Sequence, residues 1–413
     1  MIKFLKKKEH IIMKRRDFFK TAAVVGAATF SSSTFASEIA IRQPINNGPA
    51  SKINFPEKRA MVTYSDRPPL LESPREVFTH SVTPNDQFFV RWHMPEIPTM
   101  TDTQSFTISV NGLVNNEFKV TLKQLKEEFE QVEVTAVLQC GGNGRSAFQP
   151  TTGGVQWGNG AMGCAKWKGV RLRDLLHRAG LKEGAEWIGF NGLEHAAYYE
   201  TPNFVRELHL HELDDHVIVA YEMNGEDLPY LNGYPVRLVL PGYYSDSWVK
   251  MLSNITVTDK YKNLFFMDHA YRVPDNETES ETPENEFKKT KPITLMNLKS
   301  VIGFPENNAT IAYDSQLVVR GVAFDNGIGI SKVLISLDDG KTWEESLLDD
   351  DKAGRYAFRK FRYGFKPKIY GEIRIMARAV DKFGKEQPLI KDVKWNHGGY
   401  KFNGVEVITV NAR

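Results

Sequence analysis

The pattern of hydrophobic and polar positions changes once along the chain, and its first part mixes strand-like with helix-like periods. Between about residues 78 and 270, alternating or short apolar runs predict strands at 105–110, 132–138, 217–221, 235–240 and 255–258. Helical spacing predicts helices at 122–129, with Thr121 as N-cap, and at 172–179, ending at Gly180. Strands and helices at irregular spacing indicate an α+β domain, not a regularly wound βαβ fold.

The second part of the chain carries strand patterns without helical ones. Apolar runs at 317–324, 331–337 and 371–380 are separated by turns such as Asp338-Asp339-Gly340. Strands at this spacing predict a β-sandwich of about 120 residues. The acidic, turn-rich segment 274–291 is typical of a linker between the two parts. Residues 37 to about 75 are polar and proline-rich, so we expect an arm on the surface.

Composition narrows the class of protein but not its chemistry. The chain has 413 residues, 41% hydrophobic and 25% charged, which is ordinary for a globular protein of two or three domains. Lys and Arg number 53 against 51 Asp and Glu, so nothing in the charge favours nucleic acid as a partner. No stretch approaches about 20 apolar residues, so we expect no membrane span in the mature chain.

The N-terminus has the form of an export signal. Lys14-Arg15-Arg16-Asp17-Phe18-Phe19-Lys20 resembles a twin-arginine motif, and a short apolar run at 21–30 follows it. Thr34-Phe35-Ala36 is a small-residue cleavage site. We therefore predict a signal peptide at 1–36 and a periplasmic protein that is exported already folded. The alternative is an amphipathic N-terminal helix.

Only two cysteines occur, and one of them opens a glycine-rich loop. Cys140 and Cys164 could form one disulfide in an exported protein. However, Cys140 follows a strand and precedes Gly141-Gly142-Asn143-Gly144-Arg145, where glycines allow close backbone approach and Arg145 adds positive charge. Such surroundings favour a thiolate, which serves either as a nucleophile or as a soft-metal ligand.

Three other segments combine glycines, aromatic residues and cations. They are 88–93, with Arg91 and His93 on one strand face, 157–164, and 232–250, with Arg237 and Lys250. Backbone amides, arginine forks and a lysine together could hold an anionic organic cofactor.

These segments resemble the sulfite oxidase family in sequence order. Leu138-Gln139-Cys140-Gly141-Gly142-Asn143-Gly144-Arg145 is similar to the family's molybdenum-ligand loop, and 89–93 is similar to its arginine segment. Trp157, the segment 163–172 and Tyr271 follow the family pattern, and 332–343 resembles its C-terminal immunoglobulin-like domain. The resemblance implies a molybdopterin-binding catalytic domain at 37–284 and an immunoglobulin-like dimerisation domain at 285–413.

The resemblance also implies a molybdenum–molybdopterin cofactor and a role for each matching residue. Cys140 would be the metal ligand, and Cys164 a small buried residue. The implied substrate-pocket residues are Arg91, Arg145, Trp157 and Tyr271. The implied cofactor contacts are Phe89, Val90, Arg91, His93, Asn232, Arg237, Trp248, Val249 and Lys250.

The implied activity is oxidation of sulfite to sulfate, with electrons passing to a c-type cytochrome because the chain has no Cys-x-x-Cys-His haem motif. A homodimer, or a heterodimer with a cytochrome subunit, would be the assembly. The alternatives are a sulfane dehydrogenase, a molybdenum reductase, or a secreted binding protein with a Cys140–Cys164 disulfide. Two positions depart from the family pattern: Gly144 replaces a second arginine, and Asn232 replaces the histidine of vertebrate members.

Overall fold

The computed structural model describes residues 55–59, 61–99, 103–195, 198 and 200–413. The predicted signal at 1–36 and the first part of the predicted arm lie outside these residues. No helix in the part of the chain that is described is long and apolar enough to cross a membrane.

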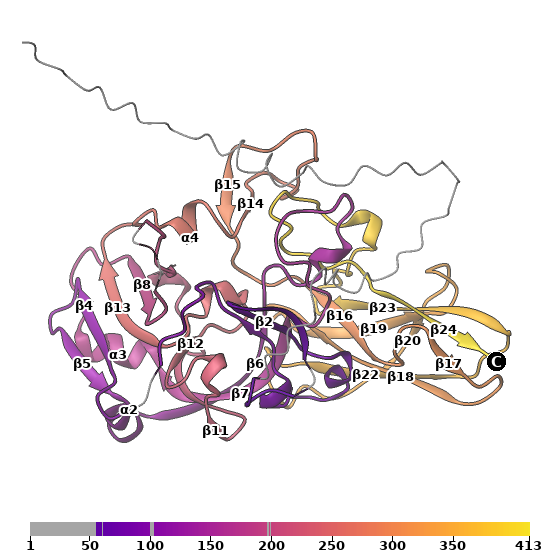
Figure 1. Cartoon of the computed structure of the whole chain (residues 1–413), viewed down its shortest axis with the longest axis horizontal. Coiled ribbons are helices and arrows are strands. Elements are labelled where there is room, and N and C mark those ends of the chain that lie inside the picture. The colour runs from indigo at the N-terminus through magenta and orange to yellow at the C-terminus, as the bar shows by residue number, and fades with distance from the viewer. Residues whose placement is uncertain (1–54, 60, 100–102, 196–197, 199) are drawn as a thin grey trace, which may run out of the picture. The chain divides into compact units, whose positions relative to one another are not determined.

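Two five-stranded sheets form the first part of the chain (Figure 1). One has the order β11-β10-β7-β6 with β12 added against β10. Its strands are β6 (Gln131–Gln139), β7 (Met162–Arg171), β10 (Ile218–Met223), β11 (Glu226–Asp227) and β12 (Arg237–Val239). The other has the order β5-β4-β13-β8-β9. Its strands are β4 (Thr107–Gly112), β5 (Phe118–Thr121), β8 (Trp187–Gly192), β9 (Val205–His209) and β13 (Leu252–Thr258).

The helices of this part begin and end where the sequence predicts. Helix α2 (Leu122–Glu128) is capped by Thr121, whose hydroxyl accepts from the Gln124 amide while the Gln124 side chain reaches back. Helix α3 (Leu172–Ala179) buries one apolar face and ends at Gly180, which has φ +67°. A third, short helix is α4 (Phe265–Asp268). The α+β class of this part is confirmed.

The predicted surface arm is instead part of the structure from residue 61 onward. Strands β1 (Val62–Asp66), β2 (Pro69–Glu72) and β3 (Val90–Arg91) form a three-stranded sheet. Leu71 is fully buried in it, and the Glu72 carboxylate accepts the amides of Gly158 and Gly160 at 2.8 Å each. The expectation of a surface arm was wrong for this stretch because its few apolar residues are concentrated on one strand, β2, that is covered on both faces.

The second part of the chain is the predicted β-sandwich, lying at the orange and yellow end of the ribbon (Figure 1). One sheet contains β16 (Lys299–Phe304), β18 (Leu317–Phe324), β22 (Arg359–Phe365) and β21 (Leu347–Leu348). The other contains β17 (Ala309–Ile311), β24 (Val407–Ala412), β23 (Gly371–Asp381), β19 (Ile330–Ser336) and β20 (Glu344–Glu345). Their inner faces share one apolar core.

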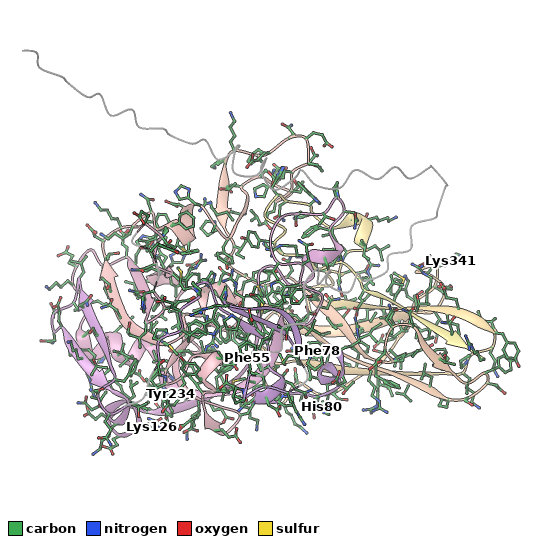
Figure 2. The ribbon with its side chains drawn as sticks, viewed as in Figure 1. Phe55, Phe78, His80, Lys126, Tyr234 and Lys341 are labelled. Atoms are coloured by element: carbon green, nitrogen blue, oxygen red, sulfur yellow. The ribbon has the colours of Figure 1, made fainter. Side chains whose placement is uncertain are left out.

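Side chains of the first part pack directly on the sandwich. Phe78, labelled in Figure 2, meets Phe358 edge to face with 6.1 Å between ring centroids. Segment 274–291 is also anchored, because β14 (Arg272–Pro274) pairs with β15 (Thr290–Pro292). Glu279 in this segment bonds Lys401 at 2.7 Å and Lys291 at 2.9 Å. The segment therefore does not behave as a free linker, and the boundary between 284 and 285 stays a prediction.

Candidate functional site

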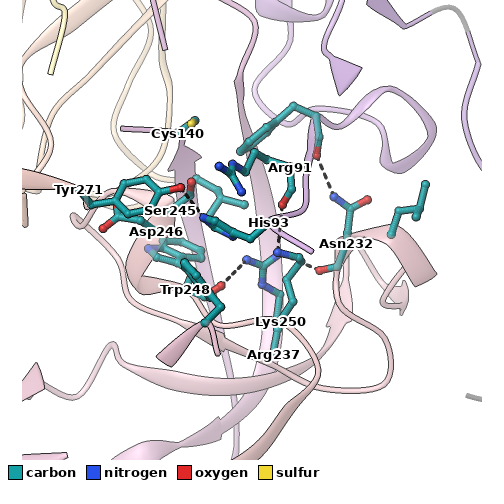
Figure 3. Close-up of a pocket in the computed structure, with 14 residues that line it drawn as sticks. Arg91, His93, Cys140, Asn232, Arg237, Ser245, Asp246, Trp248, Lys250 and Tyr271 are labelled. Carbon is teal, nitrogen blue, oxygen red and sulfur yellow. Dashed lines mark hydrogen bonds between the residues drawn. The ribbon is translucent and has the colours of Figure 1, made fainter. Parts of the chain in front are cut away.

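One pocket lies where β6 ends. It is lined by Phe89, Arg91, His93, Leu138, Cys140, Phe204, Leu231, Asn232, Arg237, Ser245, Asp246, Trp248, Lys250 and Tyr271. Figure 3 shows Cys140, Tyr271, Ser245 and Asp246 at one end, and Asn232, Arg237 and Lys250 at the other. Arg91 and His93 lie between the two ends. The chain thus brings together residues that are up to 182 positions apart in sequence, from Phe89 to Tyr271.

Cys140 is held at the point where the chain leaves the sheet. Its amide donates to the Ala161 carbonyl at 2.9 Å, next to the last β6–β7 pair, Gln139 and Met162. Both cysteines are free and buried, and Cys164 sits inside β7 opposite Val137. The disulfide alternative is therefore not formed. Burial raises the pKa of the Cys140 thiol, while the charges of Arg91 and Arg145 act to lower it.

The Cys140 end of the pocket presents buried polar atoms without a protein hydrogen-bond partner. Nη1 of Arg91 and Nδ1 of His93 are buried and have no hydrogen-bond partner. His93 Nε2 contacts the Tyr271 hydroxyl. Burial, and then the charges of Arg91, Lys250 and Arg206, hold the pKa of His93 well below its usual value, and burial raises that of Tyr271. A neutral imidazole and a protonated phenol form one hydrogen bond with each other, and Nδ1 of His93 is left facing the pocket without a partner.

The opposite end is a buried cationic site. Arg237 donates to the carbonyls of Asn232 at 2.7 Å and Trp248 at 3.1 Å, but its Nε is unpartnered and no ion pair to it is formed within the described residues. Burial lowers its pKa to about 9. Lys250 donates to the Arg91 carbonyl at 3.0 Å, and its carboxylate partner Glu194 is 4.0 Å away. Burial lowers the pKa of Lys250 to about 8, against the opposing charge of Glu194.

These features fit an anionic organic cofactor with a metal that accepts sulfur. A thiolate such as that of Cys140 is a soft ligand suited to such a metal. Buried polar atoms without a partner, on Arg91, His93 and Arg237, are costly unless a ligand supplies their hydrogen bonds. Arg237 and Lys250 would hold the anionic group of a molybdopterin, and Cys140 its metal.

Two predicted substrate-pocket residues do not line this pocket. The Arg145 guanidinium donates to three backbone carbonyls, those of Val155 at 3.0 Å and of Gly398 and Gly399 at 3.1 Å. Trp157 is 1% exposed and packs edge to face on Tyr64 at 4.8 Å. Arg145 acts on Cys140 through its charge and through the loop that it fastens, and Trp157 lies in the core.

Two predicted cofactor contacts also turn away from the pocket. The side chains of Val90 and Val249 are buried in apolar clusters beside it. Val90 lies between the lining residues Phe89 and Arg91, and Val249 lies between Trp248 and Lys250. Where the chain is extended, successive side chains point to opposite sides, so each valine faces away from the pocket. The departure at Gly144 has a steric reason: the residue has φ +84°, and a Cβ there would lie 2.6 Å from the Phe402 ring.

Several residues that complete the site were not predicted from the sequence. Lys58 donates to Asn232 Oδ1 at 2.6 Å, and the Glu57 carboxylate accepts the amides of Tyr230 and Leu231. A second buried pair, Arg206 and Asp246, stands beside Tyr271. Phe204 stacks on His93 with 3.7 Å between ring centroids. Asp246 lies within the glycine-rich segment 232–250 but was not itself predicted, and the other residues come from segments with no recognisable pattern, so only the fold places them here.

Comparison with known proteins agrees with this chemistry. Residues 93–266 match the oxidoreductase molybdopterin-binding domain, and 290–408 match the Mo-co oxidoreductase dimerisation domain. The chain is 31% identical to sulfite oxidase of Gallus gallus over 349 residues, covering 81% of this chain and 74% of that protein. It is 30% identical to mitochondrial sulfite oxidase of Rattus norvegicus over 354 residues, which is 82% of this chain but only 63% of the rat protein.

A solved structure extends the agreement to the fold. The sulfane dehydrogenase SoxCD from Paracoccus pantotrophus superimposes with a TM-score of 0.73 at 25% identity, covering 91% of this chain and 92% of that one. The predicted family, fold class and molybdenum–molybdopterin cofactor are thereby confirmed. With the single thiolate, the cationic cofactor end and both matching domains in place, the chain belongs to the sulfite oxidase family of molybdopterin enzymes.

Proposed function

We propose that this protein is a molybdenum-dependent sulfite dehydrogenase that converts sulfite and water to sulfate, two protons and two electrons. One observation carries the proposal: the unpartnered Nη1 of Arg91 faces a buried pocket that also contains the Cys140 thiol. A fixed guanidinium donor beside a soft-metal ligand suits a small sulfur oxyanion. The relatives' sulfite oxidase activity supports the same assignment.

The residues of the chain would bind and orient the substrate. Arg91 would hold an oxyanion oxygen, and the Tyr271 phenol, kept protonated by burial, would hydrogen-bond the substrate. The buried walls, including Phe204 and Leu138, exclude water and so strengthen these contacts. When bound, the molybdenum cofactor supplies oxygen-atom transfer and takes up two electrons.

We further propose that the enzyme works in the periplasm and passes its electrons one at a time to a c-type cytochrome. The twin-arginine motif at 14–20 supports export after folding, because a buried cofactor is inserted before the pocket closes. A two-electron reaction with no haem motif in the given sequence supports an external one-electron acceptor.

A second candidate is a sulfane dehydrogenase, which oxidises sulfur carried by a partner. It is favoured by one observation, the likeness to the Paracoccus pantotrophus sulfane dehydrogenase over 91% of this chain. The same pocket would then receive a sulfur group at the end of an extended carrier.

The test is turnover by the purified, molybdenum-loaded protein with cytochrome c as acceptor. We expect sulfite alone to reduce the cytochrome, with one sulfate formed for every two cytochromes reduced. The matched control is Cys164→Ala, which removes a buried thiol outside the pocket. No reduction with sulfite by a protein that contains molybdenum would refute the sulfite assignment, and reduction only with a thiol-bound sulfur carrier would favour the second candidate.

A further inference from the structure

A buried carboxylate stands in the part of the pocket where an anion is expected. Asp246 and Ser245 follow β12 in a short turn and line the pocket with Cys140 and Tyr271 (Figure 3). Asp246 Oδ2 lies 2.7 Å from Arg206 Nη2, and both side chains are 2% exposed. Both carboxylate oxygens of Asp246 are buried and neither has a hydrogen-bond partner, so Arg206 acts on the carboxylate through its charge.

The arginine of this pair is fixed from the outside. Arg206, on β9, also donates to the Phe266 carbonyl of helix α4, and its guanidinium lies 5.7 Å from the centre of the Tyr271 ring. The pair is therefore anchored through β9 and α4, on the side of Arg206. Because Arg206 balances the charge, Asp246 is kept in a site from which a lone carboxylate would be driven by desolvation.

The charges at this end of the pocket add up to little net attraction for a doubly charged anion. Arg91 is the lining cation nearest to Cys140 (Figure 3), and Arg145, whose guanidinium donates to three backbone carbonyls, is not a lining residue. Arg206 is already neutralised by Asp246. A fully deprotonated oxyanion in contact with Asp246 Oδ1 would meet a carboxylate with nothing between them, which is repulsive in a buried site.

The same arrangement favours a substrate that carries a hydrogen. A carboxylate oxygen without a partner accepts a hydrogen bond strongly from an O–H or S–H group, and such charge-assisted bonds are roughly twice as strong as neutral ones. The guanidinium of Arg206, 2.7 Å from Oδ2, favours the charged form of the Asp246 carboxylate. The carboxylate therefore acts as an acceptor there.

We propose that Asp246, positioned by Arg206, is a specificity residue that selects sulfur oxyanions bearing a proton, such as hydrogen sulfite, over fully deprotonated dianions. This inference rests on the proposed function, because it concerns the substrate of the same pocket. Asp246 touches the substrate in this scheme, whereas Arg206 acts only through Asp246 and is a positioning residue.

The test compares two tetrahedral anions of nearly equal size that differ in hydrogen. At neutral pH inorganic phosphate carries at least one O–H group and sulfate carries none. Calorimetric binding of each to the molybdenum-loaded protein should give at least about 10-fold tighter binding of phosphate in the wild type. In Asp246→Asn the preference should fall by about 10-fold or more, because the amide can donate to sulfate and no longer repels it.

The matched control breaks another buried ion pair. Glu406 forms an ion pair with Arg75, with 2.5 Å between Oε1 and Nη2, and neither residue lines the pocket. Glu406→Gln should therefore keep the wild-type preference for phosphate. Arg206→Lys should also retain it, because the balancing charge remains. If Asp246→Asn fails to fold, the double variant Arg206→Met/Asp246→Asn removes both charges and must lose the preference.

An unchanged phosphate-to-sulfate ratio in Asp246→Asn would overturn the proposal. So would loss of pterin and molybdenum from that variant, since Asp246 would then hold the cofactor instead of the substrate. Binding is measured without turnover, so a failed sulfite assay would leave this result interpretable, and a failed binding test would leave the sulfite assay standing.

Discussion

Replacing Arg237 by methionine tests whether this arginine stabilises the fold or binds the cofactor. Arg237 is 2% exposed and lies over the Trp167 ring at 5.2 Å, with no ion-pair partner in the part of the chain that is described. Methionine has a similar length and can keep the contact with the indole ring. The change removes one buried positive charge and two hydrogen bonds, those to the carbonyls of Asn232 and Trp248.

The two effects on the cofactor-free protein oppose each other. Burial lowers the pKa of Arg237 from its usual value to about 9, which corresponds to a cost of roughly 5 kcal/mol for the buried charge. Each carbonyl that loses its donor costs about 1–3 kcal/mol. We therefore expect the free energy of unfolding of the cofactor-free Arg237→Met protein to change by no more than about 2–3 kcal/mol. Removing one partner of a buried ion pair would cost more, roughly 3–5 kcal/mol.

The cofactor-loaded protein should respond in one direction only. A charge-assisted hydrogen bond to a phosphate contributes about 1.5–3 kcal/mol, so the variant should bind the cofactor about 10- to 100-fold more weakly. Urea unfolding of the cofactor-free forms and molybdenum and pterin content after dialysis measure the two effects. Arg178→Met is the control, since Arg178 also stacks on an aromatic ring, Phe129 at 3.8 Å, but lies outside the pocket. Full cofactor retention by Arg237→Met, or a large loss of cofactor-free stability, would refute the reasoning.

Three further predictions follow from the same structure. Cys140→Ala should keep the fold and lose molybdenum-centred activity, as judged by circular dichroism and cytochrome reduction; full sulfite oxidation by this variant would remove Cys140 as the ligand. Arg91→Gln should raise KM for sulfite by at least about 10-fold while the melting temperature stays within a few degrees, because it removes a charge-assisted donor that no protein group uses; an unchanged KM would take Arg91 out of the substrate site. Burial acts to raise the pKa of Glu279, but hydrogen bonds and charges of Lys401 and Lys291 outweigh it and lower the pKa to about 2. Its contribution to stability, roughly 1–3 kcal/mol after discounting for its partial exposure, is thus present above about pH 4.5 and is lost as the pH falls towards about 2. Glu279→Gln should lower the melting temperature at neutral pH and leave it nearly unchanged near pH 2; an equal loss at both pH values would contradict the ion-pair origin.

The pattern of neighbouring residues was enough to predict these helices and strands, because helix caps and strand alternation depend on residues close together in sequence. The Thr121 cap, the Gly180 ending and the alternation of 317–324 each depend on residues a few positions apart, and the structure has α2, α3 and β18 there. Polarity was a poor guide to the arm and the linker. Glu72 and Glu279 are charged, yet each is bound by groups from distant segments, the amides at 158 and 160 and the lysines at 291 and 401.

The sequence by itself determined the ligand and its family, because Cys140, its glycine loop and Arg91 belong to short motifs whose residues are neighbours along the chain. Only the tertiary structure decided which side chains face the pocket. It turned Arg145 towards three carbonyls and Trp157 into the core, and it brought Lys58 and Arg206 to the site from segments without a motif. The physical reason is that hydrogen bonding and burial depend on residues that are distant in sequence. The charge of an arginine follows from its residue type, whereas its hydrogen-bond partners follow only from the fold.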